Sequence, residues 1–411
     1  MPHSASPFTL PRWIDPEAAF LHLFADSPHA FWLDAGVDAD TGWSWIGEGR
    51  PDAAASPLHR DATAPTTAQE AGPFRGGWVG WRTYESETTF LRVERFLAFD
   101  HASRRVFAFG DAALAARALD APFAPAVAEP VRRGTASARI SPAGYTESIA
   151  ACRDAIREGF AYQLCLTTRF TVAGAFDAVE VFRRLRRASG SHHAGFIRTG
   201  DVALASASPE RFLEVRDGRV HTHPIKGTRP RSQDPAVDAA LVEDLRTDAK
   251  ERAENVMIVD LMRNDLSRVC EPSSVGVDRL LEVETYPHVH QLVSEVSGRL
   301  VPGTTVGDLL AATFPAGSMT GAPKESAMQI LAELEGEPRG VYAGAFGWVG
   351  DDGAADLAMV IRSVVIEADA AWVGAGGGIT WRSVAASEVA EVGIKARAPL
   401  AALGAEVPPG W

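Results

Sequence analysis

Short segments of alternating apolar and polar residues fill the first third of the chain, and this pattern predicts a sheet. The segments "HAFWLDA", "GGWVGWRTYE", "FLRVERFLAFD" and "RRVFAFG" are rich in aromatic residues and are separated by frequent turns. Two stretches, 47–73 and 119–142, show neither the helix nor the strand period. We expect the second stretch to be a linker, which divides the chain into a sheet-rich N-terminal region (1–137) and a second domain (138–405).

Helices and strands mix after residue 138. Apolar residues three and four positions apart predict helices in "AGYTESIAACRDAIREGF", "DAKERAENVMIVDLMRNDL" and "GAPKESAMQILAELEG". Strands are predicted in "AGAFGWVG", "LAMVIRSVVIE" and "AWVGAGGGIT". Because these elements come in runs rather than in regular βαβ alternation, we expect an α+β fold.

The composition is that of an ordinary soluble globular protein, with 46% hydrophobic and 23% charged residues. The net charge of -13 supplies no positive field for phosphates, so we expect no nucleic acid and no membrane as partner. The three cysteines form no C-x-x-C pair, which is typical of a reducing compartment. Neither a signal peptide nor an apolar run of ~18 residues is apparent. These observations together predict a cytoplasmic protein.

Lys226 stands in "HTHPIKGTRPRS", between Ile225 and a glycine. The preceding "RFLEVRDGRVHTHPI" predicts a β-hairpin with Asp217-Gly218 as its two-residue turn. Counting back from this turn places Glu210 opposite Ile225, beside Lys226. The sequence therefore predicts an amine and a carboxyl group as neighbours in space.

Two conditions decide whether Lys226 is reactive or only a solvated lysine in a basic turn. Strict alternation would put Glu210 and Lys226 on opposite faces, unless Pro209 or Pro224 distorts the strand ends. The nearby arginines 229 and 231 would weaken the hold of Lys226 on its proton, because like charges disfavour the ammonium form. An amine in that position is a candidate nucleophile.

Glu251 and Glu254 lie three residues apart, on one side of a predicted helix. The same stripe continues through Ile258 and Leu261, which are expected to face the core. A carboxylate on such a stripe is costly unless it is paired or bound to a metal. A hard divalent cation such as Mg²⁺ would compensate that cost.

Glu388 and Glu391 repeat the same spacing in "ASEVAEVGIK". Together the two pairs would suit Mg²⁺. The alternative is a simple ion pair, since Lys395 follows Glu391 by four residues.

Two small-residue segments, "FPAGSMTGAPK" and "VGAGGGIT", would let backbone N–H groups approach an anion. Neither matches the Walker or the dinucleotide fingerprint, and tight turns are the alternative explanation. Arg362 stands within a predicted apolar strand, where a buried guanidinium needs an anionic partner. These features together predict a pocket for a small di-anion.

At this point the motifs resemble those of a known family. "PIKGTRPR", "AENVMIVDLMRNDLSRV", "FPAGSMTGAPKESAMQIL", "YAGAFGWVG", "VIRSVVI" and "GAGGGI…SEVAEVGIKA" occur in the order found in the chorismate-utilising enzymes. That family comprises anthranilate synthase component I, aminodeoxychorismate synthase component I, and the isochorismate and salicylate synthases. The resemblance implies an anthranilate synthase component I-like fold, with two packed antiparallel sheets flanked by helices.

The resemblance also implies a branch of the family. Anthranilate synthases typically carry alanine where this chain has Lys226, and the water-using branches carry a lysine base where it has Gln163. The aminodeoxychorismate synthase component I branch carries lysine at the first position. The implied reaction is that of a transferase, the Mg²⁺-dependent amination of chorismate by ammonia to 4-amino-4-deoxychorismate, a precursor of p-aminobenzoate and folate.

In the implied mechanism Lys226 attacks C2 of chorismate and Glu210 protonates the departing 4-hydroxyl group. Ammonia, expected from a separate glutamine amidotransferase subunit, then adds at C4 and expels the lysine. Mg²⁺ would be held by Glu254 and Glu391, with Glu251 and Glu388 acting mainly through water. The remaining implied substrate contacts are Gln163, Thr228, Ser318, Tyr342, Arg362, Gly376, Gly377, Gly378 and Lys395.

Two alternatives stay open. The chain would be an anthranilate synthase component I if amination occurred at C2 with loss of pyruvate. It would be a non-catalytic chorismate-binding or regulatory subunit if it kept the fold without turnover. In addition, "WLDA" (32–35) replaces the Leu-Glu-Ser motif of a tryptophan pocket in some relatives, so feedback by tryptophan is not expected.

Overall fold

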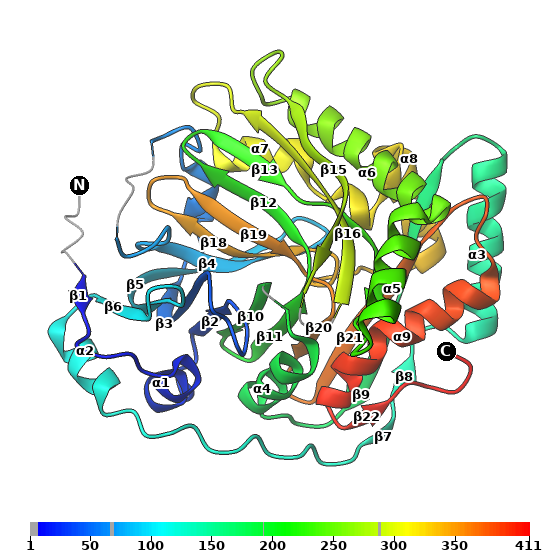
Figure 1. The fold of residues 1–411 in the computed structure, drawn as a ribbon. Helices are drawn as coiled ribbons and strands as arrows, with labels where there is room; N and C mark the ends of the chain where they lie inside the picture. Colours follow the sequence, from blue (N-terminus) through cyan, green and yellow to red (C-terminus); the bar gives the residue numbers. More distant parts are fainter. Residues whose placement is uncertain (1–6, 66–69, 192, 287–288) are drawn as a thin grey trace.

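The computed structural model describes residues 7–65, 70–191, 193–286 and 289–411. It contains two antiparallel sheets that share one long strand, β5 (Thr88–Asp100) (Figure 1). The first part of β5 pairs with β4 (Gly77–Arg82) and the last part with β6 (Arg105–Phe109). Because β5 belongs to both sheets, it fixes how they lie against each other.

The first sheet runs from β6 through β5 to β3 (Trp43–Pro51), and the second begins at β4. All pairings within both sheets are antiparallel. The first sheet continues with β2 (Ala30–Asp34), β10 (His193–Thr199), β11 (Val202–Ser208), β20 (Ser363–Ile366), β21 (Ala370–Ile379) and β9 (Gln163–Ala173), and it also holds β1 (Phe8–Thr9), β8 (Ser137–Ala138) and β17 (Gly321–Ala322). The second continues with β18 (Ala345–Gly350), β19 (Ala355–Met359), β12 (Arg211–Arg216), β13 (Arg219–Thr222) and β16 (Val289–Arg299), which pairs with both β14 (Ile225–Pro230) and β15 (Gly276–Thr285). A separate parallel pair joins β7 (Gly134–Thr135) to β22 (Ala405–Glu406).

Helices cover the outer faces of both sheets (Figure 1). Helices α3, α4, α8 and α9 pack on the first sheet, and α5 and α6 pack on the second. Their bounds are α1 Pro16–Leu23, α2 Ala112–Leu119, α3 Pro142–Arg157, α4 Ala178–Ser189, α5 Pro235–Thr247, α6 Ala249–Ser267, α7 Val306–Thr313, α8 Lys324–Glu335 and α9 Ala385–Ala402, with 3₁₀ turns at Ser56–His59 and Gly317–Met319.

Alternation along β2 shows why there are two hydrophobic cores. Phe31 points into the core between the sheets, together with Trp348 of β18. Its neighbour Trp32 points the other way, into the core between the first sheet and the helices, together with Phe20. Successive side chains on a strand face opposite sides, so one strand supplies both cores.

The α+β class and the two packed antiparallel sheets are confirmed, whereas several local predictions need correction. The segment "LAMVIRSVVIE" forms two strands, β19 and β20, because the backbone turns at Arg362, whose φ is +52°. The stretch 47–73 begins inside β3, and 119–142 holds two short strands. "VGAGGGIT" lies largely within strand β21 rather than in a turn.

The predicted boundary near residue 138 does not interrupt the hydrogen bonding. β2 pairs with β10, and β4 pairs with β18, so strands on either side of the boundary form common sheets. An extended segment after α2 runs along the outside to β7 (Figure 1). The division into two regions stays a prediction.

None of the described helices is both long and apolar enough to cross a bilayer. All three cysteines are free and buried.

Candidate active site

The predicted hairpin carries Glu210 and Lys226 into one site. Asp217 and Gly218 form its turn with positive φ values, and Glu214 pairs with His221 in the predicted register. The second strand then breaks: β13 ends at Thr222 and β14 begins at Ile225, on either side of Pro224. This break frees the Lys226 side chain from the alternation of the hairpin.

The carboxyl group of Glu210 is buried beside the positive charge of Lys226. Burial raises the pKa of Glu210, while the charge of Lys226, the Ser318 hydroxyl and Lys395 oppose the rise. The backbone of Glu210 is held by Ser208 Oγ, at 3.3 Å from its nitrogen. A raised pKa favours the protonated form of this carboxyl group, which is the form that a general acid requires.

The arginines that follow Lys226 are not the free cations that the sequence predicted. Arg229 is paired with Asp244 at 2.6 Å and with Asp248 at 3.1 Å. Arg231 is paired with Asp238 at 3.0 Å. Asp238 and Asp244 belong to helix α5 and Asp248 joins α5 to α6, so carboxylates of this region neutralise both guanidinium groups.

The two glutamate pairs face each other from α6 and α9. Glu254 and Glu388 are buried, with 8% and 2% of their surface exposed, while Glu251 is half-buried. Burial raises the pKa of Glu254 to about 7, against the opposing charges of Lys226 and Lys250. Glu251 packs against Gly227, where a Cβ would come within 3.1 Å of its side chain.

Glu391 forms the ion pair that the sequence predicted, and its role as a metal ligand stays a prediction. Lys395 Nζ lies 2.7 Å from Glu391 Oε1, which is the predicted ion pair. The same ammonium donates to the carbonyl oxygen of Gly376 at 2.9 Å. Burial alone would raise the pKa of Glu391, but Lys395, Lys250 and Lys226 together outweigh it and lower that pKa.

Lys250 is a member of the site that the sequence patterns missed. Its Nζ lies 3.2 Å from Glu388 Oε1 and 3.9 Å from Glu254 Oε1, so it links α6 to α9. One signal in the sequence could have drawn attention to it. Only four of the 40 basic residues are lysines, and three of them (226, 250 and 395) lie here.

The glycines of β21 form a wall without side chains. A Cβ at Gly378 would collide with Gln163 Nε2, and one at Gly377 would lie 3.3 Å from Glu388 Oε2 and 3.9 Å from Glu391 Oε1. Gln163 is buried, and its Oε1 has no hydrogen-bond partner among the described residues. Space and an unpaired acceptor therefore remain beside the carboxylates.

Arg362 and Tyr342 extend the site in the neighbourhood of Glu391. The described residues offer the Arg362 guanidinium no hydrogen bond and no ion pair, although Glu391 and Tyr342 lie near enough to affect it. Burial lowers the pKa of Arg362 and raises that of Tyr342, whose ring packs on Gly374. A guanidinium left without a protein partner suits a carboxylate ligand.

Two of the predicted substrate contacts differ in burial. Ser318 is buried in the 3₁₀ turn next to Glu210. Thr228 is exposed on β14, just past a register shift at Gly227, and nothing in the described part of the chain brings its hydroxyl to the other site residues. Its role as a substrate contact stays a prediction.

The residues fit a divalent cation in their chemistry. Glu254 Oε1 is buried without a hydrogen-bond donor in the described ranges, and Gly377 leaves room beside Glu388 and Glu391. The spacing is looser than that of a closed metal site. Over the described residues, the group of three ligands within 4.8 Å of one another is His221, Asp278 and Glu295 instead. There Glu295 already accepts from His221 and Arg279, each at 3.0 Å.

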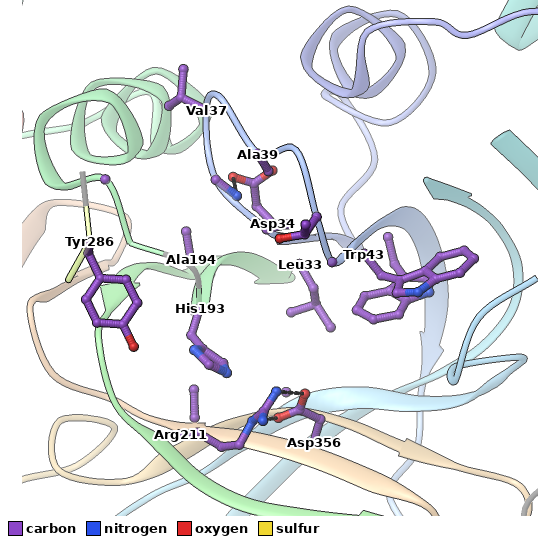
Figure 2. Close-up of a pocket in the computed structure, with 18 of the residues that line it drawn as sticks. Leu33, Asp34, Val37, Ala39, Trp43, His193, Ala194, Arg211, Tyr286 and Asp356 are labelled. Atoms are coloured by element: carbon purple, nitrogen blue, oxygen red, sulfur yellow. Dashed lines mark hydrogen bonds and ion pairs between the residues drawn. The ribbon is translucent and has the colours of Figure 1, made fainter. Parts of the chain in front are cut away.

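A cavity of about 930 Å³ lies elsewhere, and no predicted site residue lines it. Figure 2 shows Arg211 paired with Asp356 on one side and the loop around Asp34 on the other. The carboxylate of Asp34, in the "WLDA" segment, accepts hydrogen bonds from Trp32, Gly36, Ser44 and Arg186. The hydrogen bonds to the Asp34 carboxylate therefore come from the protein itself. The expectation about tryptophan stays a prediction.

The site brings together four kinds of chemical group. It offers an amine, a buried acid, a set of carboxylates facing one another, and cationic or neutral donors for a second anionic group. Such a site can hold a di-anion and exchange groups on it.

Comparisons with known proteins agree with this geometry. The family model described as "chorismate binding enzyme" matches residues 67–401. The aminodeoxychorismate synthase of Streptomyces pristinaespiralis is 37% identical, covering 95% of this chain and 64% of that protein. The anthranilate synthase component 1 of Streptomyces coelicolor is 39% identical, covering 80% and 73%. The structure of anthranilate synthase component I from Streptococcus pneumoniae superposes with a TM-score of 0.72 at 30% identity, covering 96% and 92%.

Proposed function

The chain belongs to the chorismate binding enzyme family, and on that premise we propose that it aminates chorismate with ammonia to give 4-amino-4-deoxychorismate. Similar proteins include members of both the aminodeoxychorismate and the anthranilate branch. The observation that supports the aminodeoxychorismate branch is the position of Lys226, which follows the strand break at Pro224. This break leaves Lys226 beside a buried Glu210 rather than on the opposite face of the hairpin.

The proposed reaction uses these two residues in sequence. The Lys226 amine forms a bond to C2 of the ring, the double bond shifts, and the 4-hydroxyl group leaves as water with the proton of Glu210. Ammonia then bonds to C4, the shift reverses, and the lysine amine leaves C2. The net change is loss of water and gain of ammonia, and Glu210 regains its proton from the incoming nitrogen.

The two carboxylates of the substrate need separate binding sites. We assign one to Arg362, Tyr342, Ser318 and the backbone of Gly376–Gly378, because the Arg362 guanidinium has no hydrogen bond or ion pair with any described residue. The other carboxylate would approach Glu251, Glu254, Glu388 and Glu391. Mg²⁺, when bound by these glutamates, would supply the positive charge that a carboxylate requires there.

We propose further that a glutamine amidotransferase subunit supplies the ammonia. The numbering of similar proteins as component 1 supports a two-component system. The three free, buried cysteines fit a reducing compartment, so we place the reaction in the cytoplasm.

The test is product identity. The chain is incubated with chorismate, Mg²⁺ and excess ammonium, and the product is identified by mass for the wild type and for Lys226→Ala. Aminodeoxychorismate from the wild type, with amination lost or redirected in the variant, supports the proposal. Anthranilate from the wild type would assign the chain to the anthranilate branch, and absence of turnover with retained chorismate binding would indicate a regulatory subunit.

A further inference from the structure

Lysine is used very selectively in this chain. Of the 40 basic residues only four are lysines, and arginine makes nearly all the other ion pairs. Lys324 pairs with buried Asp265 at 2.6 Å, Lys395 with Glu391 at 2.7 Å, and Lys250 with Glu388 at 3.2 Å. Three of the four lysines thus pair with a carboxylate in the described part of the chain.

Lys250 reaches a buried pair of carboxylates from the surface. It is the second residue of α6, and 41% of its side chain is exposed. Its ammonium contacts Glu388 Oε1 and lies 3.9 Å from Glu254 Oε1, an oxygen with no hydrogen-bond donor among the described residues. The side-chain exposures of Glu388 and Glu254 are 3% and 10%, so water can solvate neither carboxylate well.

We propose that Lys250 is a resident counter-cation, which neutralises Glu388 and Glu254 when no divalent ion is bound and is displaced toward solvent when one binds. The proposal rests on the proposed function, because it takes these glutamates as Mg²⁺ ligands. Two buried carboxylates without a cation would repel each other and destabilise the fold. Lys250 removes that cost, but its ammonium then competes with the metal ion for the same two carboxylates.

The choice of lysine over arginine follows from this role. A lysine ammonium is a point charge on a flexible stem, and it can withdraw while its stem still packs. An arginine would grip a carboxylate through two parallel hydrogen bonds and would be harder to displace. The half-exposed stem of Lys250 gives the ammonium a path to solvent.

The experiment compares Lys250→Met and Lys250→Arg with the wild type, with Mg²⁺ alone as the probe. Binding is measured by isothermal titration calorimetry, and the melting temperature is recorded in EDTA and in Mg²⁺. We expect Lys250→Met to bind Mg²⁺ roughly tenfold more tightly, because one like charge has been removed. Its melting temperature should fall in EDTA and recover in Mg²⁺. Lys250→Arg should keep its stability in EDTA and bind Mg²⁺ more weakly than the wild type.

Lys324→Met serves as the matched control, because Lys324 also neutralises a buried carboxylate of α6. It should lower the melting temperature equally in EDTA and in Mg²⁺ and leave Mg²⁺ affinity unchanged. An unchanged or weaker Mg²⁺ affinity in Lys250→Met would overturn the proposal, as would a wild type that binds no Mg²⁺. If Lys250→Met does not fold even in Mg²⁺, the affinity of Lys250→Arg decides.

These titrations contain no chorismate, so they are independent of product identity. A wild type that makes anthranilate would refute the proposed function and leave the role of Lys250 standing. If the wild type makes aminodeoxychorismate and the Lys250 variants bind Mg²⁺ with unaltered affinity, the proposed function stands and the role of Lys250 is refuted.

Discussion

The guanidinium of Arg339 holds both carboxylate oxygens of Glu335, at 2.7 and 2.8 Å, with both side chains almost fully buried. The same guanidinium donates to the carbonyl oxygens of Met319 and Cys165. It therefore ties the end of α8 to β9 and to the 3₁₀ turn that carries Ser318. A buried ion pair of this kind is costly to break, because the remaining charge loses its partner.

Glu335→Gln should lower the free energy of unfolding by about 3–5 kcal/mol, since it leaves Arg339 charged and buried. Urea unfolding monitored by circular dichroism measures the change. The matched control is Asp154→Asn, which breaks an exposed pair with Arg157 on α3 and should change stability by less than about 1 kcal/mol. Equal effects of the two substitutions would mean that the buried pair contributes no more than a surface pair.

Glu210→Gln should separate activity from stability. We expect kcat to fall roughly 10²- to 10⁴-fold, because the proposed general acid is lost. The same substitution should stabilise the protein at neutral pH, because burial disfavours the charged carboxylate and raises the pKa of Glu210. Initial rates and thermal unfolding at pH 7.5 test both expectations together.

The pH dependence of that gain has a defined direction. The raised pKa of Glu210 contributes stability that is complete below its unfolded-state pKa of about 4.3 and is lost as pH rises through the folded-state value. The advantage of Glu210→Gln over the wild type should therefore grow from pH 4 to pH 8. A constant difference across that range would contradict the burial of the carboxyl group.

Arg362→Met should raise the KM for chorismate by roughly 30- to 100-fold, the loss expected for a charge-assisted hydrogen bond to a carboxylate. It should also raise the melting temperature, because Arg362 is a half-buried cation without a hydrogen-bond or ion-pair partner in the described part of the chain. Steady-state kinetics and thermal unfolding give the two numbers. A lower melting temperature with unchanged KM would show that Arg362 acts in folding and not in binding.

Gly377→Ala should weaken Mg²⁺ binding by roughly three- to tenfold while leaving the protein folded. The new Cβ would lie 3.3 Å from Glu388 Oε2 and would crowd the space beside the carboxylates. Gly276→Ala is the control, because its Cβ would meet only Asp278 Oδ1, at 4.0 Å. Calorimetric titration with Mg²⁺ measures both variants, and equal affinities would show that the space at Gly377 is not used.

Local patterns in the sequence predicted those parts of the site that depend on neighbouring residues. The Asp217-Gly218 turn fixes the register of its hairpin, because only one pairing follows from a two-residue turn. The i,i+3 spacing of Glu251 and Glu254 fixes their common side of α6. The register shift at Gly227 and the turn at Arg362 could not be predicted in this way. Both depend on what packs against the strand, such as Leu245 and Glu251 against Gly227.

Local sequence patterns could not predict contacts between elements that are distant in the chain. Lys250 and Glu388 are neighbours only because α6 and α9 cover adjacent parts of the two sheets. The pairing of Arg229 and Arg231 with α5 cancels the positive charge expected around Lys226 for the same reason. In each case the decisive partner lies on another element, and its position is set by the sheet as a whole.

The shared strand β5 has a consequence for how the protein is made. On the ribosome, β4 and β5 emerge early, but the partner of β4 on its other edge is β18, near the end of the chain. At a translation rate of about 5–20 residues per second, this edge of β4 stays unpaired for tens of seconds until β18 is synthesised. An open, apolar strand edge is an aggregation hazard for all of that time. Slower translation would lengthen this exposure and favour inclusion bodies, and chaperone binding to the nascent chain should concentrate on 77–82.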